Sequence, residues 1–416
     1  MFQLVMIMVL AVEPVSLDLE GFTVLALEHS PLIHEITASR MQAEASYITT
    51  RAALFPKLGF SASCGHTWAD LETDSYTVGL SLSQEIPFSA GGASLLSTRA
   101  ASLGMVQAGF NSEAAMLSLK RSVALAFYDA VEAMMQVSVA QTALERSSTL
   151  LRRVEILFET GSATAVDLSG ARVEETGDRL SLLLKEQQYA ATMETLAVLC
   201  GVQDGSGFTV DTSRILVPLN ELEVVALGDL AGRNPSLSAD SVGLRRAELS
   251  ASAAARSWLP SISLGGSVGL SDDEFDLGEL SDNATWGVSV NVNWQLFDGF
   301  QRSGQTTAAR AAVLQAEADL AAAEIESASA VRVALDVLPA SAEGLSLAEL
   351  RLEYARQKAD LCEMKYGMGA LDLEELLEAH ADLSEAEAGR VSALTECLRA
   401  EVEYLVQNGM SPRVEN

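Results

Sequence analysis

The sequence is short of positive charge. Only 27 Lys and Arg residues stand against 57 Asp and Glu among 416 residues, which gives a net charge of −30. Binding to nucleic acid or to anionic lipid headgroups depends on clustered Lys and Arg, so this balance argues against both. With 49% hydrophobic residues the chain is nevertheless too apolar for an intrinsically disordered protein. Its length alone suggests two domains.

Cysteine and histidine are also scarce, with four of each. No two of the cysteines form a CxxC pair, and the histidines lie far from them in sequence, so neither a zinc site nor a disulfide scaffold is expected. The chain also lacks a Ser-His-Asp or Cys-His context and a phosphate-binding loop. We therefore expect no enzymatic activity, no metal and no cofactor.

Long hydrophobic runs are missing, with one short exception at the N-terminus. Residues 2–12 read FQLVMIMVLAV, which is too short for a helical membrane span of about 20 residues. The length suits the apolar part of an export signal, which we expect at residues 1–15, although no Lys or Arg precedes the run. A buried N-terminal element and a misplaced start codon are the alternatives. With no other candidate helix, a membrane-embedded form of this chain must cross the bilayer as β-strands.

Proline is infrequent, and two long segments, residues 88–217 and 261–338, contain none. The stretch 93–158 is rich in Ala, Leu and Glu and predicts one very long helix. A helix of this length buries little of itself in a compact domain, so we expect coiled-coil packing against similar helices. Pro339 predicts a kink or break in the corresponding helix of the second half.

The chain is an internal duplication. Landmarks recur at an offset of 208 residues: Gly161 with Gly369, Asp167 with Glu375, Leu168 with Leu376, Ala171 with Ala379 and Gly201 with Gly409. Such a constant offset predicts two repeats with the same fold. The repeats cover residues 17–201 and 221–409, joined by a linker at 202–220 and followed by a tail at 410–416.

Each repeat contains two segments in which apolar and small polar residues alternate. They span about 58–68 and 77–88 in the first repeat and about 261–271 and 285–297 in the second. This period of two predicts strands with two different environments, one apolar and one polar. After each pair of strands comes a long helical hairpin, with its tip at Gly161 or Gly369.

The strands have the length that a tilted strand needs to cross a bilayer. Trp286 and Trp294 stand near the two ends of one strand, as residues of an interfacial girdle do. A soluble sandwich with one solvated face is the alternative for any single strand. However, four strands cannot close a water-filled barrel, and lipid does not tolerate open sheet edges. Several chains would have to pool their strands.

Several motifs together carry a family resemblance. They are Asn234-Pro235, Ala247-Glu248 followed by Trp258-Leu259-Pro260, Leu296-Phe297-Asp298-Gly299, and a tip pattern that occurs twice. The tip pattern is an aromatic residue, two residues, Gly, five residues, an acid and Leu. It runs from Phe158 to Leu168 and from Tyr366 to Leu376. With these motifs in register with the duplication, the chain resembles the TolC-like outer-membrane efflux protein family over nearly its whole length.

The resemblance implies an α+β fold with an internal duplication, long antiparallel coiled-coil helices and four transmembrane β-strands per chain. It also implies a homotrimer with a 12-stranded barrel in the outer membrane and a helical tunnel in the periplasm. The expected function is the exit duct of a tripartite efflux or type I secretion system. The expected partners are a periplasmic membrane-fusion adaptor, an inner-membrane pump and the outer-membrane lipid. The alternative is a soluble coiled-coil scaffold without a transport role.

The resemblance also implies functional residues at the tips. Glu375 and Glu378 match acidic positions that ring the pore at its closed periplasmic end, and such rings favour cations. Tyr366 and Asp167 match positions that link neighbouring hairpins, through a charge-assisted hydrogen bond in our expectation. A basic residue expected two positions after the second tip glycine is absent, because Leu371 stands there.

The residues around the two tip glycines are expected to form the surface on which the adaptor docks. They are Thr160, Gly161, Ser162, Met368, Gly369 and Ala370. The alternative for each glycine is a turn residue with no further role, because Gly adopts positive φ at little cost. The alternative for the acidic residues is a solvated helix face.

Overall fold

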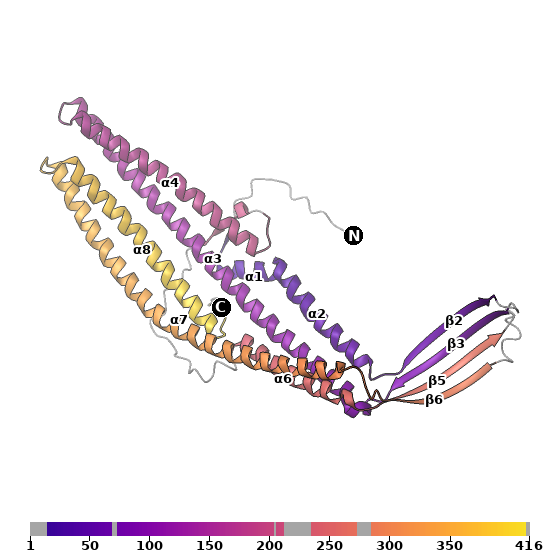
Figure 1. Ribbon diagram of the computed structural model, residues 1–416. Helices are drawn as coiled ribbons and strands as arrows, with labels where there is room; N and C mark the ends of the chain where they lie inside the picture. Colours follow the sequence, from indigo (N-terminus) through magenta and orange to yellow (C-terminus); the bar gives the residue numbers. More distant parts are fainter. Residues whose placement is uncertain (1–14, 69–72, 204, 212–233, 273–283, 413–416) are drawn as a thin grey trace. The chain divides into compact units, whose positions relative to one another are not determined.

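The computed structural model describes residues 15–68, 73–203, 205–211, 234–272 and 284–412 (Figure 1). Residues 1–14 of the expected export signal, residues 212–220 of the linker and the tips of the loops between paired strands lie outside these residues. The described chain forms two compact units. We call them the sheet unit, Ile36–Glu113 with Pro235–Ile325, and the hairpin unit, Met1–Glu35 with Ala114–Asn234 and Glu326–Asn416.

A four-stranded antiparallel sheet dominates the sheet unit, with strand order β2-β3-β5-β6. Its strands are β2 (Lys57–Thr67), β3 (Thr73–Glu85), β5 (Ser261–Asp272) and β6 (Ala284–Asn293). Helices α2 (Pro31–Ala52) and α6 (Pro235–Ala255) lead into β2 and β5. Pro56 and Pro260 follow them before the strands begin, because proline cannot continue a helix.

The register of the sheet separates two faces. Phe60 pairs with Leu80, Leu80 with Val268, and Val268 with Trp286, so one apolar row crosses all four strands. One residue further along, the row is polar or small: Ser61, Gly79, Gly269 and Thr285. The alternation read from the sequence therefore lies in phase on all four strands, as a sheet between two environments requires.

The last strand ends earlier than the alternation indicates. β6 ends at Asn293, so the segment expected to be strand up to residue 297 is not strand at its end. There the indole Nε1 of Trp294 donates a hydrogen bond to the carbonyl of Trp258 at 3.1 Å. Local side-chain contacts thus replace ladder hydrogen bonds at this point.

The long helices have the same lengths in both repeats. Helices α3 (Ala93–Glu159) and α7 (Gln301–Gly367) each have 67 residues, and α4 (Ala165–Leu199) and α8 (Leu373–Gln407) each have 35. All four begin and end at the offset of 208 residues, so the predicted duplication is confirmed. α7 continues through Pro339, and the expected break does not occur.

The largest core cluster of the hairpin unit surrounds the middle of α3. Val123, Ala124, Ala130 and Val131 are completely buried there, and Phe22 of α1 (Leu19–His29) packs against them. The stretch Ser89–Glu159 is long and apolar enough to cross a membrane by composition, which our sequence reading did not anticipate. Its most apolar part belongs to this core.

Two short strands were not predicted. β1 (Val15–Leu17) pairs in parallel with β4 (Phe208–Val210), which falls within the expected linker. Each strand has only three residues, so neither gives a readable alternation. Val210 and Phe208 pack on the core cluster, which ties the end of the first repeat to its beginning.

Candidate functional site

Both helical tips are closed by the same turn. At the first tip the amide of Gly161 donates to the carbonyl of Phe158 at 3.0 Å, and Ser162 donates to Leu157 at 2.7 Å. At the second tip Gly369 donates to Tyr366 at 3.0 Å. Gly161 and Gly369 have φ values of 77° and 69°, which favour glycine. The spacing from the aromatic residue to the glycine is therefore that of a helix C-cap.

At the first tip the acid of the tip pattern takes part in the cap of the helix that follows; at the second tip Asp372 is the cap, and Glu375 of the pattern contributes its amide. Oδ2 of Asp167 accepts from the amide of Thr164 at 2.8 Å, while the Thr164 hydroxyl accepts from the amide of Asp167 at 3.1 Å. These bonds from the backbone and hydroxyl of Thr164 lower the pKa of Asp167. In the second tip Asp372 accepts from the amide of Glu375 at 3.0 Å. The sequence pattern thus has a local structural cause.

The leucine of the tip pattern helps to join the two hairpins. A buried cluster near the tips contains Leu150, Val154, Ala171, Cys362, Leu373, Leu376 and Ala379. Leu168, Tyr366 and Leu371 pack against this cluster. Where the family pattern led us to expect a basic residue, Leu371 therefore contributes apolar contact between the hairpins.

Of the four candidate gate residues, Asp167 and Tyr366 lie close enough to interact electrostatically. Burial raises the pKa of Tyr366, and the nearby charge of Asp167 raises it further. In the described part of the chain no hydrogen bond joins these two side chains, and Thr164 occupies the Asp167 carboxylate. Glu375 and Glu378 are exposed on the first turns of α8. Each tip thus presents acidic groups to its surroundings.

The tip residues expected to dock an adaptor are mostly free of tertiary contacts. Met368 is 75% exposed, and a side chain at Gly161 or Gly369 would meet nothing within 4 Å. The hydroxyl of Thr160 donates to the carbonyl of Leu157 at 2.9 Å, within its own turn. The backbone of each tip is therefore held by hydrogen bonds within its own turn, and the surface of the tip is exposed.

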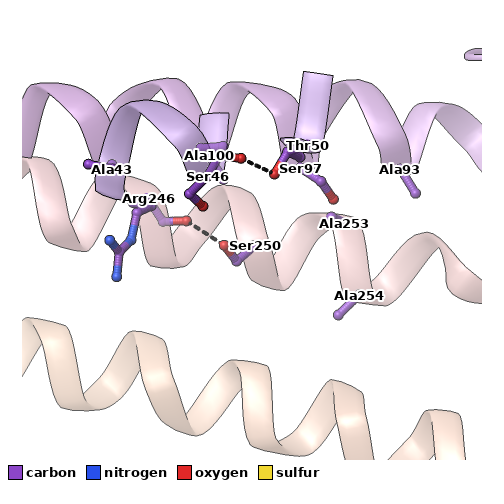
Figure 2. Close-up of a pocket in the computed structure, with 12 residues that line it drawn as sticks. Ala43, Ser46, Thr50, Ala93, Ser97, Ala100, Arg246, Ser250, Ala253 and Ala254 are labelled. Carbon is purple, nitrogen blue, oxygen red and sulfur yellow. Dashed lines mark hydrogen bonds between the residues drawn. The ribbon is translucent and has the colours of Figure 1, made fainter. Parts of the chain in front are cut away.

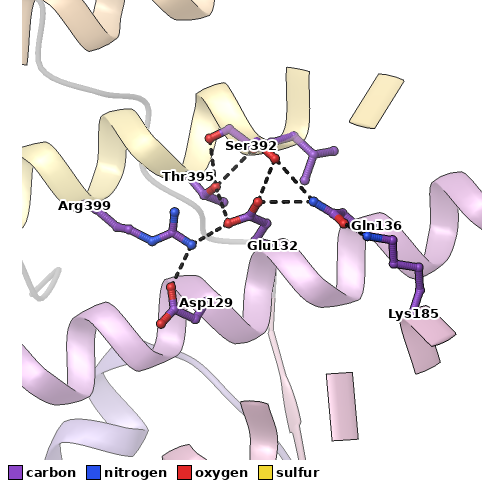
Figure 3. A network of polar contacts seen from close by, with 8 residues as sticks. Asp129, Glu132, Gln136, Lys185, Ser392, Thr395 and Arg399 are labelled. Atoms are coloured by element: carbon purple, nitrogen blue, oxygen red, sulfur yellow. Dashed lines mark hydrogen bonds and ion pairs between the residues drawn. The ribbon is translucent and has the colours of Figure 1, made fainter. Parts of the chain in front are cut away.

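A partly buried polar network joins α3 to α8 (Figure 3). The Arg399 guanidinium lies 2.5 Å from Glu132 and 2.7 Å from Asp129. Ser392 and Thr395 also donate to Glu132, at 2.7 and 3.2 Å. Burial disfavours the charge of Glu132, but these hydrogen bonds and Arg399 outweigh it and lower its pKa. Sequence reasoning missed this network because 267 residues separate Glu132 from Arg399.

Further ion pairs join the same two helices. The guanidinium of Arg146 lies 2.8 Å from Glu387 and donates to Ser384 at 3.0 Å. Nε of Arg121 lies 2.9 Å from Glu403. The junction between the two repeats within one chain thus combines several ion pairs with the apolar clusters that contain residues of both α3 and α8.

An arginine at the foot of the sheet was also missed. Nε of Arg302 lies 2.7 Å from Oδ2 of Asp298, and its guanidinium stacks over the Trp258 ring at 4.6 Å. Arg302 holds the pKa of Asp298 below its usual range. The i, i+4 spacing from Asp298 was the available signal. This ion pair explains why the Leu-Phe-Asp-Gly motif, residues 296–299, lies between the end of β6 and the start of α7.

The sheet unit contains a cleft of about 550 Å³ between α2, α3 and α6 (Figure 2). Small side chains line it. The hydroxyls of Thr50 and Ser250 donate to carbonyls of their own helices, and Arg246 is the charged group in the lining. We assign this cleft no ligand. Among the described residues, no group of acidic, His or Cys side chains is arranged to hold a metal ion.

The apolar face of the sheet is open to its surroundings. Trp286 is 80% exposed and Val288 is 91% exposed. Trp294, expected in the girdle, is 60% exposed just beyond β6. In water, such an apolar face marks an interaction surface.

The comparisons with known proteins agree with this arrangement. The family model described as outer membrane efflux protein matches residues 23–202 and 226–403, once for each repeat. The pyoverdine export outer membrane protein OpmQ of Pseudomonas putida is 24% identical over 400 residues, covering 89% of this chain and 81% of that protein. OpmQ of Pseudomonas aeruginosa is 23% identical, with 92% and 83% covered.

Solved structures show the same fold. The Campylobacter jejuni CmeC outer membrane channel superimposes with a TM-score of 0.87 at 19% identity, covering 95% of this chain and 87% of that one. The Vibrio cholerae outer membrane protein VceC gives a TM-score of 0.82 at 20% identity, with 95% and 97% covered. With both repeats matched, the chain belongs to the outer membrane efflux protein family and is an outer-membrane exit duct of an efflux system.

Proposed function

We propose that three copies of this chain form one 12-stranded barrel that exports small molecules. The sheet register carries this proposal. One face is a continuous apolar surface, the other is lined by Ser, Gly and Thr, and the strands β2 and β6 leave both sheet edges unpaired. Lipid does not tolerate open edges, and four strands are too few to close a barrel around water. Pooling the strands of several copies removes every edge.

The tips are the surface on which a periplasmic adaptor docks, and the adaptor links the duct to an inner-membrane pump. Two observations support this assignment. The same turn is built twice at the ends of the hairpins, and Met368 offers an exposed apolar side chain beside the backbone of Gly369. Thr160, Gly161, Ser162 and Ala370 complete the surface.

The acidic groups near the tips set selectivity. In a trimer Glu375 and Glu378 form two rings of negative charge, which favour cations and repel anions at a constriction. Asp167 and Tyr366 lie beside this constriction and stabilise its closed form. The support is the exposure of both glutamates and the closeness of Asp167 to Tyr366.

For the exported molecule we propose a small organic metabolite, because the relatives in both Pseudomonas species are named for export of pyoverdine. The soluble scaffold is disfavoured by the apolar face of the sheet. Complementation tests this proposal. A strain that lacks the gene for this chain should retain the exported metabolite inside the cell, and a plasmid copy of the gene should restore its release. Full release without the gene, together with a soluble protein in the periplasm, would contradict the proposal.

A further inference from the structure

Positive charge gathers at the foot of the sheet, the end where the four strands join the helices (Figure 1). Apart from Lys57 at the start of β2, the strands and the loops between them contain no Lys or Arg. The segments next to the foot carry Arg51, Arg99, Arg256 and Arg302. The net charge of −30 therefore describes the whole chain and not this end of the sheet.

A groove of about 800 Å³ opens in this region, between α2 and the beginning of α3, and we call it the foot groove. Its described lining is mainly apolar and contains two arginines but no acidic residue. The lining includes Leu54, Phe88, Leu95, Leu96, Arg99 and Arg256. Phe88 is 77% exposed, so the groove is open to its surroundings. An apolar wall beside guanidinium groups suits an amphiphile with an anionic headgroup.

The two arginines of the foot groove have no acidic partner in the described part of the chain. The guanidinium of Arg256 donates to the carbonyl of Gly91, which holds it at the edge of the groove. A guanidinium has five N–H groups, so others remain available. Arg99 is exposed, and none of the described residues forms a hydrogen bond or an ion pair with its side chain. Both arginines are therefore available to an anionic group from outside the chain.

The foot groove adjoins the apolar side of the sheet. Nε2 of Gln84 donates to the carbonyl of Leu54, a lining residue, at 3.2 Å. Gln84 pairs with Leu264, and Leu264 pairs with Val290, so Gln84 stands in a row of the apolar face. Glu85, one residue further along, belongs to the polar face. The lining therefore meets the sheet on the side that faces lipid in the proposed barrel.

Exposed aromatic side chains also stand at the foot of the sheet. Each lies within a few residues of a strand end and is about half exposed or more. They are Phe55, Phe88, Trp258, Trp294, Phe297 and Phe300. Barrels that span membranes carry aromatic girdles at the level of the lipid headgroups. Because α3 and α7 begin at this end and the duct extends into the periplasm, the headgroups here belong to the periplasmic leaflet.

The duplication provides an internal comparison. At the offset of 208 residues, Thr307 replaces Arg99 and Gly304 replaces Leu96. The second repeat thus lacks both the cation and part of the apolar wall, although it forms the same junction of strand and helix. Each chain therefore offers one such combination, and the fold of the junction does not depend on it.

We propose that the foot groove binds an anionic phospholipid of the periplasmic leaflet of the outer membrane. The phosphate lies between Arg99 and Arg256, and an acyl chain lies against Phe88, Leu95 and Leu96. Hydrogen bonds from guanidinium to phosphate are charge-assisted, and clustered cations attract an anionic headgroup. This inference rests on the proposed trimer, since a closed barrel is what places the apolar face of the sheet in lipid.

Lipid binding to the purified trimer tests this inference. Native mass spectrometry in detergent counts bound phosphatidylglycerol and phosphatidylethanolamine, added separately with the same acyl chains. The parent trimer should bind phosphatidylglycerol, one molecule per chain, in preference to phosphatidylethanolamine, whose ammonium group the arginines repel. Arg99→Gln should weaken the binding of phosphatidylglycerol about tenfold and reduce this preference.

Arg310→Gln is the matched control. Arg310 is likewise an exposed arginine near the start of a long helix, and none of the described residues pairs with its side chain. It lies outside the lining of the foot groove. The same loss of one positive charge should therefore leave the binding of phosphatidylglycerol unchanged.

Three outcomes are distinguishable. Weaker binding by Arg99→Gln alone, with a parent that prefers phosphatidylglycerol, supports the inference. Equal binding of the two lipids by the parent trimer, or the same affinity in both variants, overturns the inference and leaves the proposed trimer intact. A parent protein that forms no trimer in the same spectra contradicts the proposed function itself, and the inference with it.

Discussion

The inner and outer helices of the hairpin unit differ in what they present to their neighbours, although they are copies of each other. The inner helices α3 and α8 meet through charged pairs such as Arg146–Glu387. On the outer helices α4 and α7, Gly177 stands at the position of Glu385 and Tyr354 at the position of Arg146, at the offset of 208 residues. Within one chain the partner is always present, so a partly buried polar junction can form as the chain folds. In the proposed trimer, we expect exposed apolar side chains on α4 and α7, such as Val173 and Tyr354, to be buried against a neighbouring copy and to favour association.

The strongest way to break this comparison is to give an outer helix the charge of an inner one. Gly177→Glu reproduces Glu385 on α4, on an exposed helix face that we expect the proposed trimer to bury. Burying an unpaired charge costs several kcal/mol, so we expect the trimer population to fall at least about tenfold. Size-exclusion chromatography in detergent measures it.

Gly389→Glu is the matched control. Gly389 is also a helical glycine with open space beside it, but it lies on the inner helix α8. The same change in helix propensity and charge should leave the trimer intact. Equal dissociation by both variants would contradict the special role of the outer face.

The next effect concerns the inner junction. Glu132→Gln removes the charge that holds Arg399 and leaves a guanidinium without its main partner. We expect the free energy of unfolding to fall by about 2 kcal/mol. Glu145→Gln, on the exposed side of the same helix, should change it by less than about 0.5 kcal/mol. Denaturant titration in detergent, followed by helix content, compares the two.

A pH titration tests how much the ionised form of Glu132 contributes to stability. We expect a smaller effect than that of the substitution itself. The pKa of Glu132 is lower in the folded chain than its ordinary value of 4.5, so its stabilisation is complete above pH 4.5. It is lost as the pH falls through the folded value. The gap in melting temperature between the parent and Glu132→Gln should therefore narrow as the pH is lowered from 7 to 3. A constant gap would show that ionisation of Glu132 does not contribute.

The smallest effect is expected at the gate. Tyr366→Phe removes a hydroxyl close to Asp167 while keeping the ring that packs on the tip cluster. If the hydroxyl helps to hold the tips closed, the leak conductance in a lipid bilayer should rise a few-fold. Leak conductance equal to that of the parent would show that Tyr366 contributes only through the packing of its ring.

The fold was largely predictable from the sequence, because its signals are local and occur twice. The sequence shows the tip glycines, the long proline-free stretches and the alternating strand that contains Trp286. Each of these signals has a short-range cause. Contacts between distant segments were not predictable. Arg399 with Glu132 and the pairing of β1 with β4 join residues about 200 or more positions apart. Leu371 shows a third case, in which an apolar contact replaces a charge that the family pattern led us to expect.

The central claim is that three copies of the chain close one channel. Native mass spectrometry of the purified protein in detergent tests it most directly. Our account predicts a single species with three times the mass of the 44.1 kDa chain, less any removed export segment. A monomer or dimer as the main species, under conditions that preserve the helix content, would contradict it.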